Sequence, residues 1–320
     1  MITNIPTTEA LNDVALRLYF SAWRSLLSIR PDFEMVYPSD GDPTSTGWAD
    51  EWNAYLDACQ NELQSICTVV SQSNELALKA KICDVSPFLL IMGGEQRFSK
   101  SPRDVDFSNF RTIDAVDLPG AVNTICAKPL SDRFIQTYNQ IRALRNKITH
   151  LGQTRDPFDP GEMIRVLVFQ YTELWKDRAW LHDRLLFASD TRLAFFYDYK
   201  YTSEHMEVMQ EWPDVVRKLS SGQFKSLFGY SKDKRRYLCH ECMYNASTRY
   251  ANLDTSECKT AFLDKTGTQL HCIMCLTDYK VKRGGCNQPD CKGTVIGDNG
   301  DDYVGQCHTC GEDSVDGGGE

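Results

Sequence analysis

The sequence lacks several features that would assign it to a common class of protein. No uninterrupted apolar run reaches the roughly 18 residues that a membrane-spanning helix needs. The first residues, MITNIPTTEALND, contain no basic region followed by an apolar stretch, which a secretory signal requires. The formal net charge is −9, which argues against a protein that coats long nucleic acid by charge alone. We therefore expect a cytoplasmic protein that makes no contact with membranes.

Cysteine, by contrast, is abundant and unevenly distributed. Nine of the 13 cysteines lie between Cys239 and Cys310. In a reducing cytoplasm, dense and paired cysteines bind metal more often than they form disulfides, so the C-terminal part is predicted to be a metal-binding module. The other four stand in apolar surroundings and are predicted to be small buried side chains: Cys59, Cys67, Cys83 and Cys126.

The rest of the chain is typical of a mainly α protein. Apolar residues recur at helical spacing in several segments, and the predicted helices are 11–29, 48–83, 131–151, 161–189 and one or two within 191–229. The segment 48–83 is expected to break at most once, near 71–74, where Ser73 or Asn74 would cap its second half. After residue 236 the helical periodicity disappears.

The Cys-rich part contains four cysteine pairs, three of them with C-x-x-C spacing. Two such knuckles supply the four thiolates that tetrahedral Zn²⁺ prefers. Consecutive pairing predicts two zinc sites, Cys239/Cys242 with Cys272/Cys275 and Cys286/Cys291 with Cys307/Cys310; a crossed arrangement is the alternative. The second set resembles a zinc ribbon, with strands expected in GTVIG and YVGQ. The first has a longer insert, so Cys258 or His271 could replace a cysteine ligand.

These metals are predicted to be structural, because four thiolates leave no open coordination position for catalysis. His240 and His308, between the paired cysteines, are expected to be exposed bystanders, and His182 and His205 to be surface residues. The predicted division is a helical domain (1–200), a helical connector (201–234), a first zinc-binding module (235–283), a second zinc ribbon (284–311) and an acidic disordered tail (312–320).

The predicted helix 131–151 carries the candidate catalytic residues in its last two turns. At about 100° per residue its apolar side chains form one stripe. Arg145 lies at the edge of that stripe, where an arginine must pair with an acid, extend to water or line a cleft. Arg142, Asn146 and His150 are four residues apart and form a row beside it. The simpler interpretation is that these cations complement the helix macrodipole.

The segment RNKITH (145–150) resembles the R-x4-H motif of HEPN-domain proteins, in which Asn commonly follows the Arg and a Gly often follows the His. The resemblance extends to the helix and to the all-α character of roughly residues 10–200. The helix NELALKAKI is similar to the glutamate-bearing second helix of some members. Position 152 is Gly, where one toxin branch has a regulatory Tyr, so regulation through that tyrosine is not expected.

The resemblance implies a HEPN-like helical bundle that forms a homodimer and cleaves RNA without a catalytic metal. Arg145 and His150 from two protomers would form a composite site, with Asn146 in support. The residue types suit this chemistry, because a histidine side chain titrates near neutrality and takes a proton from the 2′-OH, while an arginine binds phosphate oxygens. Such enzymes are typically toxins or anti-phage effectors, controlled by an antitoxin or a phage-derived trigger.

Two further residues are weaker candidates, and a second function remains open. Glu75 would hold the guanidinium of Arg145, because a buried arginine needs an acid partner; alternatively it forms an exposed pair with Lys79. Arg142 would support the same site. The alternative to a ribonuclease is a non-catalytic helical dimerisation scaffold, whose zinc ribbons bind nucleic acid or a protein partner and in which Arg145 is structural.

Overall fold

The computed structural model describes residues 1–320 except 38–45, 93–103, 153–156, 299–302 and 315–320. Most of the loop predicted around residues 37–47 and most of the predicted tail 312–320 therefore lie outside the described residues. The chain divides into two compact units, Met1–Lys176 and Asp177–Glu320. This division falls before residue 200, at which we placed the end of the helical domain. In the described ranges, no helix combines the length and the apolar character needed to cross a membrane.

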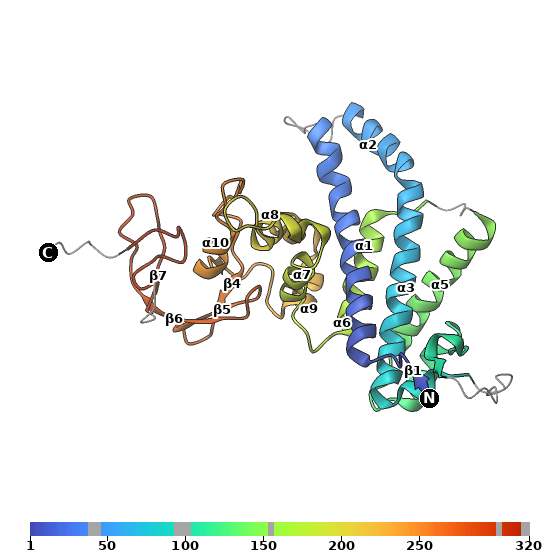
Figure 1. Ribbon diagram of the computed structural model, residues 1–320. Helices are drawn as coiled ribbons and strands as arrows, with labels where there is room; N and C mark the ends of the chain where they lie inside the picture. Colours follow the sequence, from blue (N-terminus) through green and yellow to red (C-terminus); the bar gives the residue numbers. More distant parts are fainter. Residues whose placement is uncertain (38–45, 93–103, 153–156, 299–302, 315–320) are drawn as a thin grey trace. The chain divides into compact units, whose positions relative to one another are not determined.

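The first unit is built from long helices around a central one, α3 (Figure 1). α3 packs against α1, α4, α5 and α6. The elements, in chain order, are β1 (Ile2–Thr3), α1 (Thr8–Val36), α2 (Thr46–Ala58), α3 (Gln60–Val85), the short 3-10 helix η1 (Pro87–Leu90), β2 (Val105–Asp106), the 3-10 helix η2 (Phe107–Asn109), α4 (Leu118–Ile125), α5 (Asp132–Leu151) and α6 (Pro160–Leu174). β1 and β2 form a parallel pair.

The interface of α1 with α6 is aromatic. Tyr19 and Phe20 meet Tyr171 with ring centroids 5.5 and 6.4 Å away, and the indole nitrogen of Trp175 donates to Asn12 at 3.1 Å. α1 is longer than the predicted 11–29, because the side chain of Thr7 caps it by accepting from the amide of Ala10.

The predicted segment 48–83 breaks at Cys59 rather than near residues 71–74, so this expectation was wrong. Ser73 and Asn74 lie inside α3 and are buried. The Ser73 hydroxyl donates to the carbonyl of Ala15 at 2.8 Å, and Gln170 donates to the same hydroxyl at 2.9 Å. These polar side chains therefore join α3 to α1 and α6, and they do not end a helix.

The predicted helix 131–151 is confirmed as α5, including both of its ends. Ser131 caps the first turn by accepting from the amide of Phe134 at 3.2 Å. Gly152 ends the helix in the left-handed conformation, with φ of 75°, which glycine adopts at little cost. Phe134, Tyr138 and Ile141 are buried, as the apolar stripe predicts.

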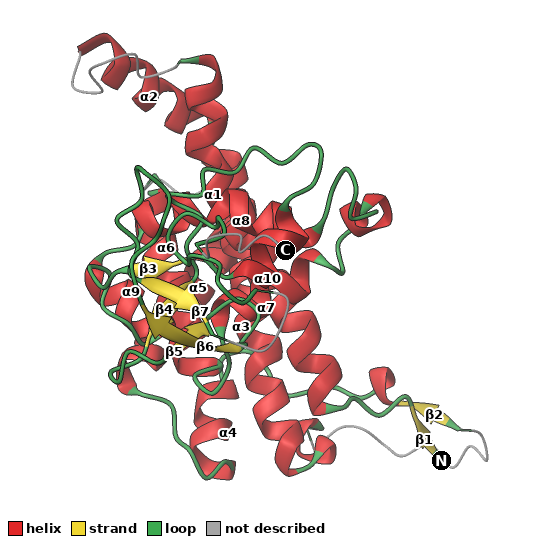
Figure 2. Cartoon of the chain, turned by 90° about the vertical axis from the view of Figure 1, so that its left-hand side faces the viewer, coloured by secondary structure: helices red, strands yellow, loops and turns green. Residues whose placement is uncertain are grey.

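The second unit combines helices with one small antiparallel sheet, drawn yellow in Figure 2. Its strands pair in the order β3-β4-β5-β6-β7. The elements are α7 (Trp180–Ala188), η3 (Arg192–Phe196), α8 (Glu204–Lys218), α9 (Ser221–Phe228), β3 (Arg236–Tyr237), α10 (His240–Ala246), β4 (Ala261–Leu263), β5 (Gln269–Cys272), β6 (Asp278–Arg283) and β7 (Val295–Gly297).

Three expectations about this part of the chain were wrong or incomplete. The predicted helix 161–189 is two helices, because α6 ends at Leu174 and α7 begins at Trp180. The segment 201–234 also contributes core to the Cys-rich part: Trp212 donates to the carbonyl of Lys259 at 3.0 Å, and the rings of Tyr230 and Phe262 stack 4.0 Å apart. Within GTVIG the predicted strand is present as β7, whereas YVGQ contributes a single bridge, from Gln306 to Asp313.

Candidate functional site

The first cysteine group joins α10 to the end of β5. Cys239 is the N-cap of α10 and Cys242 lies in its first turn, while Cys272 ends β5 and Cys275 follows in the next turn. The Sγ atoms of Cys239 and Cys275 are 3.6 Å apart, and those of Cys242 and Cys272 are 3.8 Å apart.

The second cysteine group brackets β7. The Sγ atoms of Cys286 and Cys310 are 3.7 Å apart, and those of Cys291 and Cys307 are 3.8 Å apart. In each group the four Sγ atoms lie within 4.8 Å of one another. The predicted consecutive pairing of the knuckles is therefore confirmed, and the crossed arrangement is excluded.

These distances fit a tetrahedral metal rather than disulfides. A disulfide would place two sulfur atoms about 2.05 Å apart, and all 13 cysteines are free. The edge of a tetrahedron with Zn–S bonds of about 2.3 Å is about 3.8 Å, close to the distances above. Cys258 and His271 are not ligands, because the thiol of Cys258 donates to the carbonyl of Met209 and His271 contacts Asp278 at 2.9 Å.

Backbone amides donate to several of these sulfur atoms, a contact that stabilises a thiolate. The amides of Met274, Gly293 and Thr309 donate to the sulfur atoms of Cys272, Cys291 and Cys307 at 3.3–3.4 Å. Hydrogen bonds from Cys239, then from Cys242 and Cys272, lower the pKa of the Cys275 thiol. The phenol of Tyr279 lies 3.2 Å from the sulfur of Cys239 and can donate to it.

The two cysteine groups belong to one compact unit, and two histidines lie between them. His308 and His240 are buried, with 1 % and 5 % exposure, so the expectation of exposed bystanders was wrong. The Nδ1 of His308 lies 2.8 Å from the carbonyl of Leu238, beside the first group, and its ring contacts His240 at 4.2 Å. Burial lowers the pKa of His240 to about 3. A neutral imidazole therefore suits this core, and no sequence spacing signalled the contact.

His182 and His205 are also less exposed than we expected. The Nδ1 of His182 lies 2.9 Å from the carbonyl of Met274, next to a metal-site cysteine. The side chain of His205 is 13 % exposed and lies beside Glu204. Both histidines therefore serve packing within the second unit, and the expectation of surface positions was wrong.

The second candidate site lies on α5, in the first unit. The guanidinium of Arg145 forms an ion pair with Glu75 of α3, and its Nη1 donates to the Oδ1 of Asn146 at 3.2 Å. The contact that we expected between Glu75 and Arg145 is therefore present. Lys79 donates instead to Thr112 at 3.2 Å, so the alternative pair of Glu75 with Lys79 is absent. The side chains of Arg145 and Glu75 remain 24 % and 19 % exposed.

One acidic and two basic side chains act on the phenol of Tyr138. Tyr138 is 2 % exposed, and burial raises its pKa. Glu75 adds to that rise, whereas Arg142 and Arg145 oppose it, so all three charges surround this one phenol. The Nε of Arg142 is buried and has no hydrogen-bond partner among the described residues. Glu75 is paired with Arg145, and among the described residues Arg142 has no ion pair with a carboxylate.

His150 lies apart from this cluster within a single chain. It is exposed in the last turn of α5. Five residues along a helix correspond to about 140° of rotation from Arg145, and no contact between the two side chains exists in the described part of the chain. One chain therefore supplies the predicted residues without assembling them, and a shared site needs the same helix from a second chain.

Comparisons with models of protein families, with curated proteins and with solved structures find no match. The resemblance of α5 to the HEPN motif therefore rests on Arg145, Asn146, His150 and the helices around them.

Proposed function

We propose that this chain is a metal-independent endoribonuclease of the HEPN type, with a composite site that forms when two copies of α5 meet. The observation that carries the proposal is the surplus cation beside Tyr138, in a chain of net charge −9. A half-buried guanidinium without a full complement of acids is an attractive position for a phosphate group.

Arg145 is paired with Glu75, and it would contact the same phosphate group as the neighbouring Arg142. Glu75 and Asn146 fix the guanidinium through two of its nitrogen atoms, while 24 % of the side chain faces solvent. A prepositioned donor stabilises charge that develops on the phosphate at little reorganisation cost. Asn146 and Glu75 would act as positioning residues, and Arg142 would add a second positive charge.

The proposed reaction uses the nucleophile that RNA itself carries. The imidazole of His150 removes the proton from a 2′-OH, and a bond forms between the 2′-oxygen and phosphorus. The bond between phosphorus and the 5′-oxygen breaks, and the leaving oxygen takes a proton from the imidazolium of the second copy of His150. The products are a 2′,3′-cyclic phosphate and a 5′-hydroxyl.

The two cysteine groups would hold structural Zn²⁺. The first set of ligands is Cys239, Cys242, Cys272 and Cys275, and the second is Cys286, Cys291, Cys307 and Cys310. The fit of the sulfur distances to a tetrahedron supports this identity. Zinc bound by four thiolates supplies folding energy and leaves no position for substrate. The cleavage chemistry is therefore assigned to α5 alone.

A non-catalytic scaffold is the second candidate, and the ion pair between Arg145 and Glu75 favours it. This ion pair joins α3 to α5, so it gives Arg145 a structural role that does not require RNA cleavage. In that case the zinc-bearing unit would bind the partner, and α5 would only pack against a second chain.

Cleavage of labelled RNA in excess EDTA distinguishes the two candidates. We expect wild type to produce 2′,3′-cyclic phosphate ends, and His150→Ala and Arg145→Ala to lose cleavage. Lys147→Ala is the matched control, because Lys147 is exposed on the same helix.

Metal content is measured in the same samples, so that unfolding of the cysteine groups is not mistaken for loss of a catalytic metal. Cleavage that survives His150→Ala, or a monomer in sedimentation equilibrium that cleaves fully, refutes the composite site.

A further inference from the structure

A short segment of the second unit displays large aromatic rings to solvent. Phe195, Phe196 and Tyr199 are 87 %, 66 % and 60 % exposed, and Tyr250 is 66 % exposed. Rings of this size usually lie in the core, and several of them together on a surface indicate an interaction site.

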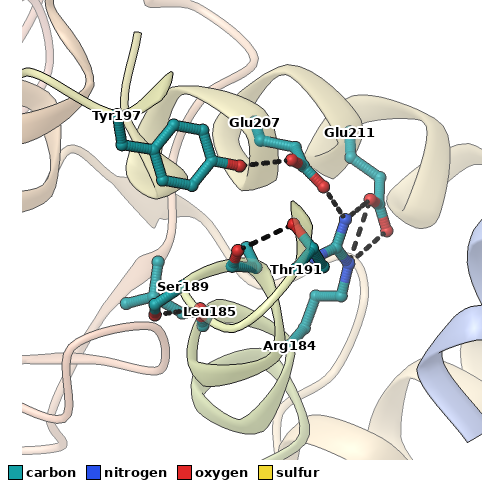
Figure 3. A network of polar contacts seen from close by, with 8 residues as sticks. Arg184, Leu185, Ser189, Thr191, Tyr197, Glu207 and Glu211 are labelled. Carbon is teal, nitrogen blue, oxygen red and sulfur yellow. Dashed lines mark hydrogen bonds and ion pairs between the residues drawn. The ribbon is translucent and has the colours of Figure 1, made fainter. Parts of the chain in front are cut away.

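The segment 195–199 is attached through Tyr197 to a buried ionic network, shown in Figure 3. Arg184 of α7 is fully buried and binds Glu207 at 2.8 Å and Glu211 at 2.5 Å. The second carboxylate oxygen of Glu207 accepts from the hydroxyl of Tyr197 at 2.6 Å. Because Tyr197 follows Phe196 directly, this anchor positions the exposed rings on either side of it.

A tight turn fixes the same segment from its other end. One carboxylate oxygen of Asp198 accepts from the amides of Lys200, Tyr201 and Thr202 at 2.7–3.3 Å. The hydroxyl of Thr202 donates to the carbonyl of Phe196 at 2.7 Å. The exposed rings therefore belong to an ordered loop, and binding to them would cost little ordering entropy.

A second segment adds an aromatic ring and positive charge. The amides of Arg249 and Tyr250 donate to the carbonyls of Lys200 and Tyr201 at 2.8 and 3.3 Å. The rings of Tyr201 and Tyr250 are 5.3 Å apart, and the charged ends of Lys200 and Arg249 lie 5.1 and 5.8 Å from the centre of the Tyr201 ring. In the described ranges, neither cation has an ion pair with a carboxylate. We call this surface the aromatic platform: Phe195, Phe196, Tyr199, Lys200, Tyr201, Arg249 and Tyr250.

We propose that the aromatic platform binds single-stranded RNA, with bases stacked on its open rings and phosphates beside Lys200 and Arg249. Exposed ring faces with interleaved cations match a ligand that repeats a flat base and a negative phosphate. An acidic protein segment would use the cations but would leave the rings without planar partners. The choice of RNA over DNA rests on the proposed function, whereas the stacking surface is independent of cleavage.

The test measures binding of a fluorescent, unstructured 16-nucleotide RNA to the full, metal-loaded chain by anisotropy. All proteins carry His150→Ala, so cleavage does not interfere and a failed ribonuclease proposal leaves the measurement intact. We expect Phe195→Ala with Phe196→Ala to weaken binding about tenfold or more, since stacking of one base is worth about that factor. Phe88→Ala, an exposed aromatic change in the other unit, should leave binding unchanged.

Replacement of the two cations gives a second readout, the salt dependence of RNA affinity. This slope would not change if Lys200 and Arg249 only supported the fold. Lys200→Ala with Arg249→Ala should reduce the slope of log affinity against log salt by about 1.4, or roughly 0.7 for each lost phosphate contact. Phe195→Trp should keep binding, which separates stacking from folding. The proposal is overturned if both double variants keep the affinity of the His150→Ala parent, if that parent does not bind RNA, or if it binds the same DNA sequence equally well. Loss of self-association with unchanged RNA binding also overturns it and assigns the platform to a second copy of the chain.

Discussion

Replacement of Arg184 should destabilise the second unit more than any change at an exposed ion pair. The side chain is fully buried and makes short contacts with two carboxylates, at 2.8 Å to Glu207 and 2.5 Å to Glu211. Arg184→Met keeps an unbranched apolar stem but leaves two carboxylates that are only 18 % and 11 % exposed. Removal of one partner from a buried ion pair typically costs about 3–5 kcal/mol, a large share of the ~5–15 kcal/mol that holds a domain.

Hydrogen exchange followed by mass spectrometry on peptides of α7 and α8 is the appropriate assay, because it reports on this unit and not on the whole chain. A loss of about 3–5 kcal/mol raises exchange from these peptides by about 2 to 3.5 powers of ten. Arg217→Met is the matched control, since Arg217 is 62 % exposed and pairs with Asp214 and Glu257 at the surface. Such exposed pairs contribute at most about 1 kcal/mol.

A triple variant separates charge from packing. Adding Glu207→Gln and Glu211→Gln to Arg184→Met removes the stranded carboxylates while it keeps their shape, so part of the lost stability should return. If Arg184→Met exchanges no faster than Arg217→Met, or if the triple variant is no more stable than the single variant, the electrostatic account of this network is wrong.

Two further predictions concern the cysteine groups. Gly293→Ala should release metal from the second cysteine group, because an added Cβ would lie 2.4 Å from the Sγ of Cys307. The control Gly222→Ala should keep both metal ions, because nothing lies within 4 Å of its added Cβ. Elemental analysis of the purified proteins checks both variants. Cys272→Ser should lower the metal content from two ions per chain to one, whereas Cys258→Ser should leave two, and equal loss in both variants would mean that Cys258 is a ligand after all.

The features that sequence predicted well are those set by local spacing. α5 was predicted with both of its ends, because Ser131 and Gly152 carry cap preferences that act over a few residues. The cysteine groups were predicted because a knuckle places two thiolates within one turn. For Glu75 the sequence left two partners open, Arg145 and Lys79, and the structure shows the pair with Arg145.

Features set by tertiary packing were missed. Helical periodicity runs through Trp175, yet α6 ends there because this residue adopts φ of −128° and packs its ring against Tyr19. Ser73 resembles a cap in sequence and instead joins α3 to α1. Whether a histidine between two cysteines is exposed depends on the segment that covers it, which for His308 is the chain around Leu238.

The aromatic segment shows most clearly why burial has to come from the fold. Within residues 195–199 the chain offers two phenylalanines and two tyrosines, and their spacing does not show which ring is buried. Tyr197 is half-buried and donates its hydroxyl to Glu207, which also binds the buried Arg184, whereas Tyr199 donates to Glu204 and stays 60 % exposed. The neighbouring rings are then left outside by chain geometry. The buried ion pair of α7 and α8 therefore contacts this loop at Tyr197, and through that contact it links the stability of the second unit to the surface that we assign to RNA.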